Sequence, residues 1–404
     1  MNRTVTARLL HALLGALTAG AILGRPAVAL QPAPWPTRGW TVSTPAQQGM
    51  NSDGLAALDS AIRAGRYGYI DRMVVVRNGY LVFNGRYRND YREIGRTRKD
   101  VLGCGVDACA NASEVHAFNY YHPDWHPYVG GRDVHTLQSV TKSVTATLMG
   151  IAMRRGELPG LEANLLTFLS DYDLSRIDPR LRRATLDDLL TMRTGIEWHE
   201  QDRPLDQTNT TVQLEQSQDW VQFRLNQPMD AEPGQKWVYN SGGSDLMSAV
   251  LRKATGRTVD VYAEEVLFGP LGIREYYWKK EPKGLPDTEG GLYLEAEQLA
   301  KIGYLYLNDG VWAGTRILPD GWVQAATARR VDRANAAGYG YGYQWWRIDR
   351  AGVPVWAGLG FGGQFLVVIP DRRIVGVINS WNIFGTRVPG ILGPFVDALL
   401  AATS

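Results

Sequence analysis

The sequence predicts an α+β fold, in which an antiparallel sheet is flanked by terminal helices and a mainly helical domain is inserted. Short runs rich in Val, Ile and aromatic residues lie near both ends of the chain, and the apolar residues between them recur at helical spacing. One sheet built from both ends accounts for this order. We expect a sheet domain of residues 30–134 and 276–404 and a helical domain of residues 135–275.

The first 29 residues have the features of an export signal. Arg3 and Arg8 give a positive start, the apolar run 9–23 is too short to span a bilayer, and residues 27–29 read Ala-Val-Ala. We therefore expect cleavage after Ala29 and a periplasmic or secreted protein without a membrane anchor. Because the leader holds three arginines and no acid, its removal changes the net charge from +2 to −1, which gives no indication of nucleic-acid binding.

The first elements expected after the leader are a helix over residues 52–63, with Ser52 in the cap position, and a hairpin. The runs 73–77 and 80–83 are β-branched and aromatic, and the Asn78-Gly79 pair between them is a strong hairpin signal.

The segment of residues 84–134 has no clear periodicity, and we interpret it as a surface insertion. It contains the two cysteines of the chain, Cys104 and Cys109, which we expect to form a disulfide that closes a small loop. Metal binding or redox chemistry by this pair is the alternative, but there is no second cysteine pair and no C-x-x-C. The histidines of the segment lack metal-motif spacing, so we predict no metal and no cofactor.

The centre of the prediction is the stretch from Gln138 to Gly156. Apolar residues at helical spacing follow Lys142 and end in two arginines and a glycine, which together mark a helix stop. Ser139 then lies at or near the helix N-terminus and shares a face with Lys142, so the hydroxyl and the amine can meet. A serine nucleophile needs a base, and Lys serves as one when burial or nearby positive charge keeps it neutral for part of the time. The alternative is that Ser139 is only a helix cap.

The remaining chain predicts helices and then strands. A long polar loop is expected over residues 197–232, with one amphipathic piece near Trp220. The expected helices are 184–192 (capped by Thr185), 244–255, 295–307 and 395–401, and the expected strands are 343–348, 353–357, 364–370 and 374–380.

Two segments can complete a site around Ser139. Tyr239 lies in a polar turn before a helix, where a phenol beside an ammonium can pass protons, although a buried, hydrogen-bonded tyrosine is the commoner role. The Gly-rich segment 358–363 precedes the strand predicted at Gln364 and can present backbone N–H groups to an oxyanion or an extended substrate. Its glycines can also serve only to let the sheet pack.

These three motifs, in this order, resemble the serine β-lactamase and penicillin-binding superfamily, in particular its class C-like branch. That branch includes esterases, D-alanyl peptidases and 6-aminohexanoate-dimer hydrolases. The resemblance covers roughly residues 45–400 and is supported by the segments 185–195 and 290–319. It implies a β-lactamase/transpeptidase-like fold.

The resemblance also implies the roles of individual residues. Ser139 would be the nucleophile that becomes acylated, Lys142 its proton acceptor or electrostatic partner, and Tyr239 a base or proton shuttle. The backbone N–H groups of Ser139 and Phe361 would form the oxyanion hole. The residues expected to contact substrate are Ser241, Gly358 and Gly360.

The sequence departs from the superfamily pattern at two motifs. The usual Tyr-x-Asn is Tyr239-Asn240-Ser241 here, so either Ser241 fills the Asn position or Asn240 reaches the site by another backbone path. The third motif usually begins with Lys or His, but residues 358–360 read Gly-Leu-Gly. Because that cation binds the carboxylate of β-lactams and D-alanyl peptides, we expect a substrate without a carboxylate there, or a cation from another loop.

Three hypotheses follow for function. The first is an exported serine hydrolase that cleaves a small-molecule amide or ester through an acyl-enzyme on Ser139. The second is a D-alanyl-D-alanine carboxypeptidase or β-lactamase. The third is a non-catalytic ligand-binding or sensor domain, which the intact set of Ser139, Lys142 and Tyr239 disfavours. No G-x-S-x-G occurs, so a Ser-His-Asp hydrolase is not indicated, and we interpret His135 as structural. The sequence indicates neither the substrate nor the oligomeric state.

Overall fold

The computed structural model describes residues 34–90, 93–94, 134–335, 337–383 and 388–403. All of them belong to one compact unit that begins at Ala33. The predicted signal peptide, the Cys104–Cys109 disulfide and the histidines of the insertion lie outside the described residues. The predicted domain boundaries stay a prediction.

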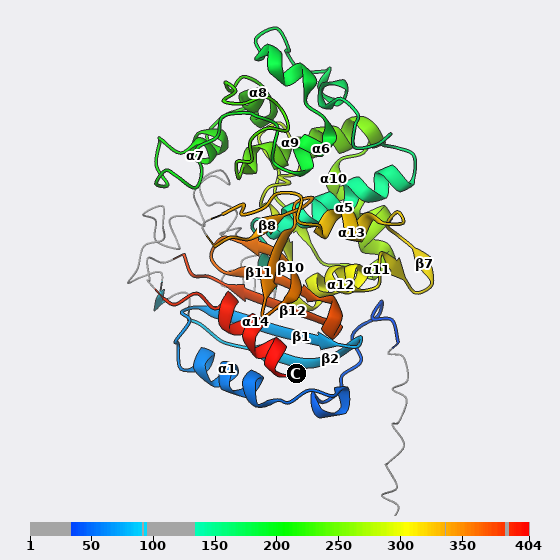
Figure 1. Cartoon of the computed structure of the whole chain (residues 1–404), viewed down its shortest axis with the longest axis vertical. Coiled ribbons are helices and arrows are strands. Elements are labelled where there is room, and N and C mark those ends of the chain that lie inside the picture. Colours follow the sequence, from blue (N-terminus) through cyan, green and yellow to red (C-terminus); the bar gives the residue numbers. More distant parts are fainter. Residues whose placement is uncertain (1–33, 91–92, 95–133, 336, 384–387, 404) are drawn as a thin grey trace, which may run out of the picture. The chain divides into compact units, whose positions relative to one another are not determined.

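The main sheet has seven strands in the order β2-β1-β12-β11-β10-β9-β8, and each neighbouring pair is antiparallel (Figure 1). The chain's two ends therefore build one sheet, which confirms the predicted fold class. The predicted hairpin is also present, with Asn78 and Gly79 both at positive φ in its turn. The strands are β1 (Ile70–Arg77), β2 (Tyr80–Arg86), β8 (Gly340–Tyr341), β9 (Trp346–Arg350), β10 (Val353–Gly360), β11 (Gln364–Ile369) and β12 (Ile374–Ser380).

Helices cover both faces of this sheet, and the alternation of side chains in β1 shows it. Val74 and Val76 belong to the core shared with α5 (Val140–Arg154) and α12 (Ala296–Leu307). Met73 and Val75 belong to the core shared with the terminal helices α1 (Asp53–Arg63) and α14 (Leu392–Ala401). Both faces are buried, which explains why β1 reads as a continuous apolar run.

Most of the remaining elements lie between β2 and β8 in chain order, and Figure 1 shows most of them in green to yellow. Two further small sheets pair β3 and β4 with β5, and β6 with β7. The helices are α6 (Leu186–Leu190), α7 (Thr210–Glu215), α8 (Trp220–Leu225), α9 (Ser241–Thr255), α10 (Val259–Ala263), α11 (Gly269–Leu271) and α13 (Trp322–Thr327). The short strands are β3 (His135–Thr136), β4 (Tyr277–Trp278), β5 (Leu292–Leu294), β6 (Val311–Trp312) and β7 (Thr315–Arg316). Single 3-10 turns lie at Ala46–Gln48, Leu165–Leu169, Pro179–Arg183 and Pro370–Arg372, and a π-helical turn at Glu264–Phe268.

Several predicted boundaries were wrong, and local capping explains two of them. Helix α9 begins at Ser241 because the side chain of Asn240 accepts a hydrogen bond from the amide of Gly243. The loop predicted over 197–232 contains two short helices rather than one amphipathic piece, since Asn209 caps α7 through the amide of Thr211. Helix α1 is present as predicted, but the side chain of Ser52 makes no cap hydrogen bond.

The Gly-rich segment was predicted to precede a strand, but residues 358–360 belong to strand β10 itself. Gly358 pairs with Leu366 and Gly360 with Gln364 in the ladder with β11. A Cβ atom on Gly360 would lie 2.4 Å from the carbonyl oxygen of Leu137. The glycines therefore let the end of β10 lie directly against the start of α5.

Gly150 has the same packing role in the middle of α5. A Cβ atom there would lie 2.5 Å from Cε2 of the Trp322 indole on α13. We expect Gly150→Val to destabilise the fold by about 2–3 kcal/mol, because a buried fused ring cannot move aside without shifting a helix. Urea unfolding measures this. Gly160→Ala is the control, because its Cβ atom would meet nothing within 4 Å, and equal stabilities for the two variants would contradict the packing argument.

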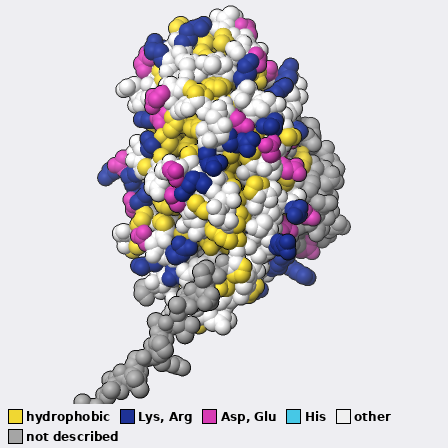
Figure 2. Space-filling model, turned by 90° about the vertical axis from the view of Figure 1, so that its right-hand side faces the viewer, with side chains coloured by type: hydrophobic (Ala, Val, Ile, Leu, Met, Phe, Trp, Pro, Cys, Tyr) yellow, Lys and Arg dark blue, Asp and Glu magenta, His cyan; other side chains and the backbone are white. Residues whose placement is uncertain are grey.

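Among the described helices, none is long and apolar enough to cross a bilayer. On the face shown in Figure 2, the described Lys and Arg side chains lie interspersed with Asp and Glu. The described part of that face therefore has no continuous patch of one charge.

Candidate active site

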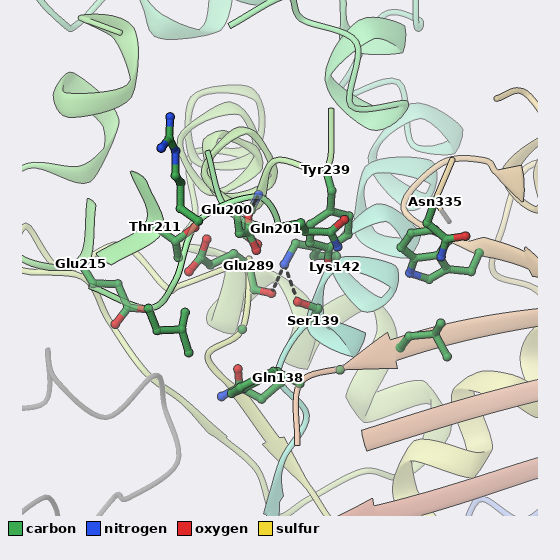
Figure 3. Close-up of a pocket in the computed structure, with 18 of the residues that line it drawn as sticks. Gln138, Ser139, Lys142, Glu200, Gln201, Thr211, Glu215, Tyr239, Glu289 and Asn335 are labelled. Atoms are coloured by element: carbon green, nitrogen blue, oxygen red, sulfur yellow. Dashed lines mark hydrogen bonds between the residues drawn. The ribbon is translucent and has the colours of Figure 1, made fainter. Parts of the chain in front are cut away.

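A cavity of about 630 Å³ lies where the start of α5, the turn before α9 and the end of β10 meet. Its lining includes Ser139, Lys142, Tyr239, Gly360 and Phe361. The structure thus brings together residues from all three motifs that were singled out in the sequence. Figure 3 shows Ser139, Lys142 and Tyr239 grouped together in the middle of this cavity.

Ser139 and Lys142 are in direct contact. The Lys142 ammonium donates hydrogen bonds to Ser139 Oγ at 2.7 Å and to the Glu289 carbonyl oxygen at 2.8 Å (Figure 3). Ser139 lies in the N-cap position of α5, but its side chain makes no cap hydrogen bond. The alternative interpretation, in which the Ser139 side chain only caps the helix, is therefore not supported. Gln138, just before it, has a left-handed φ of 47°, and such strained backbone is common where a functional side chain is presented.

Tyr239 completes the group from the turn before α9. The Lys142 Nζ atom lies 5.4 Å from its ring centroid, and the groups of Ser139 and Lys142 act to lower the pKa of its hydroxyl. Trp346 of β9 stacks on the ring at 5.8 Å with an interplanar angle of 18°. The tyrosine is therefore held by an aromatic contact on one side and by the catalytic candidates on the other.

The electrostatics favour protonated groups in the free protein. Burial raises the pKa of Tyr239 by more than the Lys142 ammonium lowers it. Burial lowers the pKa of Lys142, whereas Tyr239, Glu289, Glu200 and Asp287 raise it to the extent that they are ionised, and the net direction is upward. From the sequence, Lys142 can act as the base only on the condition that burial or nearby positive charge keeps the amine neutral for part of the time. In the structure, burial acts in that direction and the nearby acids act against it.

Asn240 and Ser241 of the Tyr-Asn-Ser motif have different structural roles. The Asn240 side chain is buried and caps α9, whereas Ser241 lines the cavity. Ser241 donates from its amide and its hydroxyl to the Glu200 carboxylate, at 2.8 and 2.6 Å, and Trp198 Nε1 donates to the same carboxylate at 2.9 Å. Of the two residues, Ser241 is the one that occupies the cavity wall.

The glycines of β10 also differ from each other. Gly360 and Phe361 line the cavity, and Phe361 is 45% exposed. Gly358 is not among the lining residues, because the position of its missing side chain faces Val140 and Ser143 of α5. The oxyanion and substrate-binding roles of these residues stay predictions.

His135, which we interpreted as structural, is not among the residues that line the cavity. The His135 Nε2 atom is 2.8 Å from Asp71 Oδ2, and its ring packs on Trp381 at 4.6 Å. Trp346 lines the cavity, but Trp198, Trp345 and Trp356 do not belong to its lining. Among the described residues, no group of three His, Cys, Asp or Glu side chains is arranged to hold a metal ion.

Three cavity residues were not found from the sequence, namely Glu200, Glu215 and Glu289. The first two lie in the polar segment 197–232, which has no motif, and Glu289 precedes the Gly290-Gly291 pair that had been noted only as a family segment. No periodic signal marks a loop acid as a cavity residue, so only the three-dimensional arrangement reveals them.

Comparison with known proteins places this geometry in context. The chain matches the family described as Beta-lactamase over residues 97–392. It is similar to the 6-aminohexanoate-dimer hydrolase of Paenarthrobacter ureafaciens, with 25% identity over 302 residues, which cover 68% of this chain and 72% of that protein. It is also similar to the lovastatin esterase of Penicillium rubens, with 28% identity over 156 residues, 35% of this chain and 39% of the esterase.

Solved structures share the fold at low sequence identity. A putative 6-aminohexanoate-dimer hydrolase from Bacillus anthracis superimposes with a TM-score of 0.63 at 21% identity and covers 84% of this chain and 80% of its own. A D-stereospecific amidohydrolase from Streptomyces gives 0.56 at 18% identity, over 86% and 98% of the two chains. These likenesses confirm the predicted β-lactamase/transpeptidase-like fold.

Proposed function

The chain belongs to the Beta-lactamase family of serine hydrolases, and from that premise we propose that it cleaves a small-molecule amide or ester through an acyl-enzyme on Ser139. The observation that carries the proposal is the 2.7 Å contact between Ser139 Oγ and Lys142 Nζ inside an open cavity, with Tyr239 beside both. Such a contact is what a serine nucleophile requires of its proton-transfer partner. We also propose export with cleavage after Ala29, on the composition of the leader alone.

Each of the three residues has a role in the proposed mechanism. Ser139 Oγ bonds to the carbonyl carbon while the deprotonated form of the Lys142–Tyr239 pair takes its proton. The same proton then passes to the departing amine or alcohol as the old bond breaks. Water repeats these steps on the acyl-enzyme and restores Ser139. The N-terminal end of α5 and the N–H group of Phe361 would stabilise the oxyanion.

The substrate class is supported by the relatives and by the cavity. The names of similar proteins include an amidohydrolase and an esterase. From these names we infer only that the substrate of this chain is an amide or an ester. Residues 358–360 supply no cation for a substrate carboxylate. Arg203 lies on the cavity wall, so a cation from another loop is present, and the β-lactamase alternative is therefore kept as an outcome of the test.

The test is intact-mass analysis after incubation with a fluorophosphonate and, separately, with a penicillin. We expect the fluorophosphonate to add once to the wild type and not to Ser139→Ala. Ser143→Ala is the matched control on the same helix, because its hydroxyl donates to the Gln344 carbonyl at 2.7 Å and lies outside the cavity. A lasting penicillin adduct would favour the cell-wall alternative, and a folded protein without any adduct would favour the non-catalytic binding domain.

A further inference from the structure

One side of the cavity is lined by carboxylates. Glu200 comes from the loop before α7, Glu215 is the last residue of α7, and Glu289 lies in the loop before β5. Figure 3 shows the three on the side of Lys142 that faces away from Asn335. Glu215 and Glu289 are only 3% and 4% exposed, so these are not ordinary surface acids.

The charges in this part of the protein do not balance. Behind the three glutamates lie two more buried acids, Asp245 and Asp287, and Glu281 adds another beyond Asp245. The buried cations that face these acids are Lys142, Arg224 and Lys279. Negative groups therefore outnumber positive ones, and Arg203 on the cavity wall is exposed to solvent.

The existing contacts leave one carboxylate oxygen of Glu289 without a partner. Arg224 pairs with Asp245 at 3.4 Å, and Lys279 reaches Glu215 only at 3.8 Å. The Lys142 ammonium is directed to the backbone carbonyl of Glu289 rather than to its carboxylate. The Glu289 Oε2 atom is buried and has no hydrogen-bond partner among the described residues. A buried acceptor of this kind is costly unless a donor fills the site.

The titration of these acids agrees with an unfilled cation site. Burial raises the pKa of Glu215 to about 7, with Lys279 acting against the rise and the neighbouring acids adding to it. Burial and then Asp287 raise the pKa of Glu289 well above its usual range. A cation beside these two carboxylates would lower both pKa values and relieve their mutual repulsion.

We propose that Glu200, Glu215 and Glu289 form a subsite for a cationic group of the substrate, a primary ammonium or a guanidinium. The glutamates do not converge as metal ligands do, since no described group of three acids is placed to hold a metal ion. The opposite part of the wall includes Trp346 and Leu359, so the substrate would carry its cation at one end and an apolar group at the other. This inference rests on the proposed function of the same cavity.

The experiment compares two ligands of equal length, hexylammonium and hexan-1-ol, as inhibitors of ester hydrolysis. We expect hexylammonium to inhibit about tenfold more strongly at about pH 8, which is above the pKa of about 7 of Glu215. The ratio should fall at about pH 5.5, because a protonated Glu215 attracts a cation less and the ammonium of the ligand remains charged throughout. Using the ratio removes the pH dependence of the hydrolysis rate itself, because both inhibitors are measured against the same reaction.

Glu289→Gln is the variant of choice, because it keeps the shape of the side chain and breaks no ion pair. It should lower the preference for hexylammonium several-fold, and Glu215→Gln provides a second variant should the first not fold. Asp202→Asn is the matched control. It removes one charge from the loop of Glu200 without touching the cavity, since its carboxylate pairs with His199, and it should leave the preference unchanged.

Calorimetry on Ser139→Ala repeats the comparison without turnover and separates the two proposals. Equal binding of the two ligands to a protein whose Ser139 reacts with a fluorophosphonate would overturn the subsite and leave the hydrolase proposal intact. Preferential binding of hexylammonium to a protein that no fluorophosphonate labels would support the subsite and overturn the hydrolase.

Discussion

Replacing Ser139 with Ala should lower kcat/KM for any ester or amide that the protein cleaves by about 10⁴-fold or more. The reason is that the acyl-enzyme cannot form without Oγ, which no neighbouring hydroxyl replaces. Ser241, the other serine of the cavity wall, already donates its proton to Glu200. Steady-state hydrolysis of an activated ester, with substrate well below the enzyme's KM, measures the loss.

Two controls make this result specific to the nucleophile. Ser143→Ala removes a buried hydroxyl from the same helix and should retain activity within a few-fold. Circular dichroism should show that Ser139→Ala is folded, because the Ser139 side chain makes no cap hydrogen bond to α5. Full activity in a folded Ser139→Ala would refute the acyl-enzyme mechanism.

Lys142→Met should reduce kcat by about 10³-fold, within the range that a positioned proton-transfer group contributes. Methionine fills much of the lysine volume but can neither hold a proton beside Ser139 Oγ nor bond the Glu289 carbonyl oxygen. Because that carbonyl would lose its donor in a buried site, the variant should also lose about 1–3 kcal/mol of stability. Kinetics and thermal unfolding of the same preparation measure both effects.

Tyr239→Phe tests which of the two proton-transfer residues, Lys142 or Tyr239, contributes more to the rate. Phenylalanine retains the stacking on Trp346 and the contact of the Lys142 ammonium with the ring face, so only the hydroxyl is lost. Its rate should therefore fall less than that of Lys142→Met. A Lys142→Met variant that keeps kcat within tenfold of the wild type would remove Lys142 from the mechanism.

The parts of the site that could be predicted are those specified by local sequence. The helix that begins after Ser139 follows from its apolar spacing and its basic, Gly-terminated end, and three-residue spacing on that helix brings Lys142 to the serine. The hairpin at Asn78-Gly79 follows from turn chemistry in the same way.

The parts that could not be predicted depend on contacts between distant segments. Helix α7 was missed because six residues carry too little periodicity, and its Glu215 becomes a cavity residue only when the fold brings it near Lys279. Gly358 resembled a substrate contact in the sequence, but its position faces Val140 across the α5–β10 contact. The acids near Lys142 could not be found from the sequence, because they come from segments that are distant from it in the chain.

The acids around Lys142 have a consequence for when the enzyme is active. They raise the pKa of Lys142, so they disfavour the deprotonated amine that the proposed mechanism requires. A substrate cation that pairs with Glu289 or Glu200 would cancel part of that effect and lower the pKa of Lys142. Binding of a cationic substrate would then favour the deprotonated form of Lys142. The protein would therefore discriminate between cationic and neutral substrates in the rate of the chemical step as well as in binding.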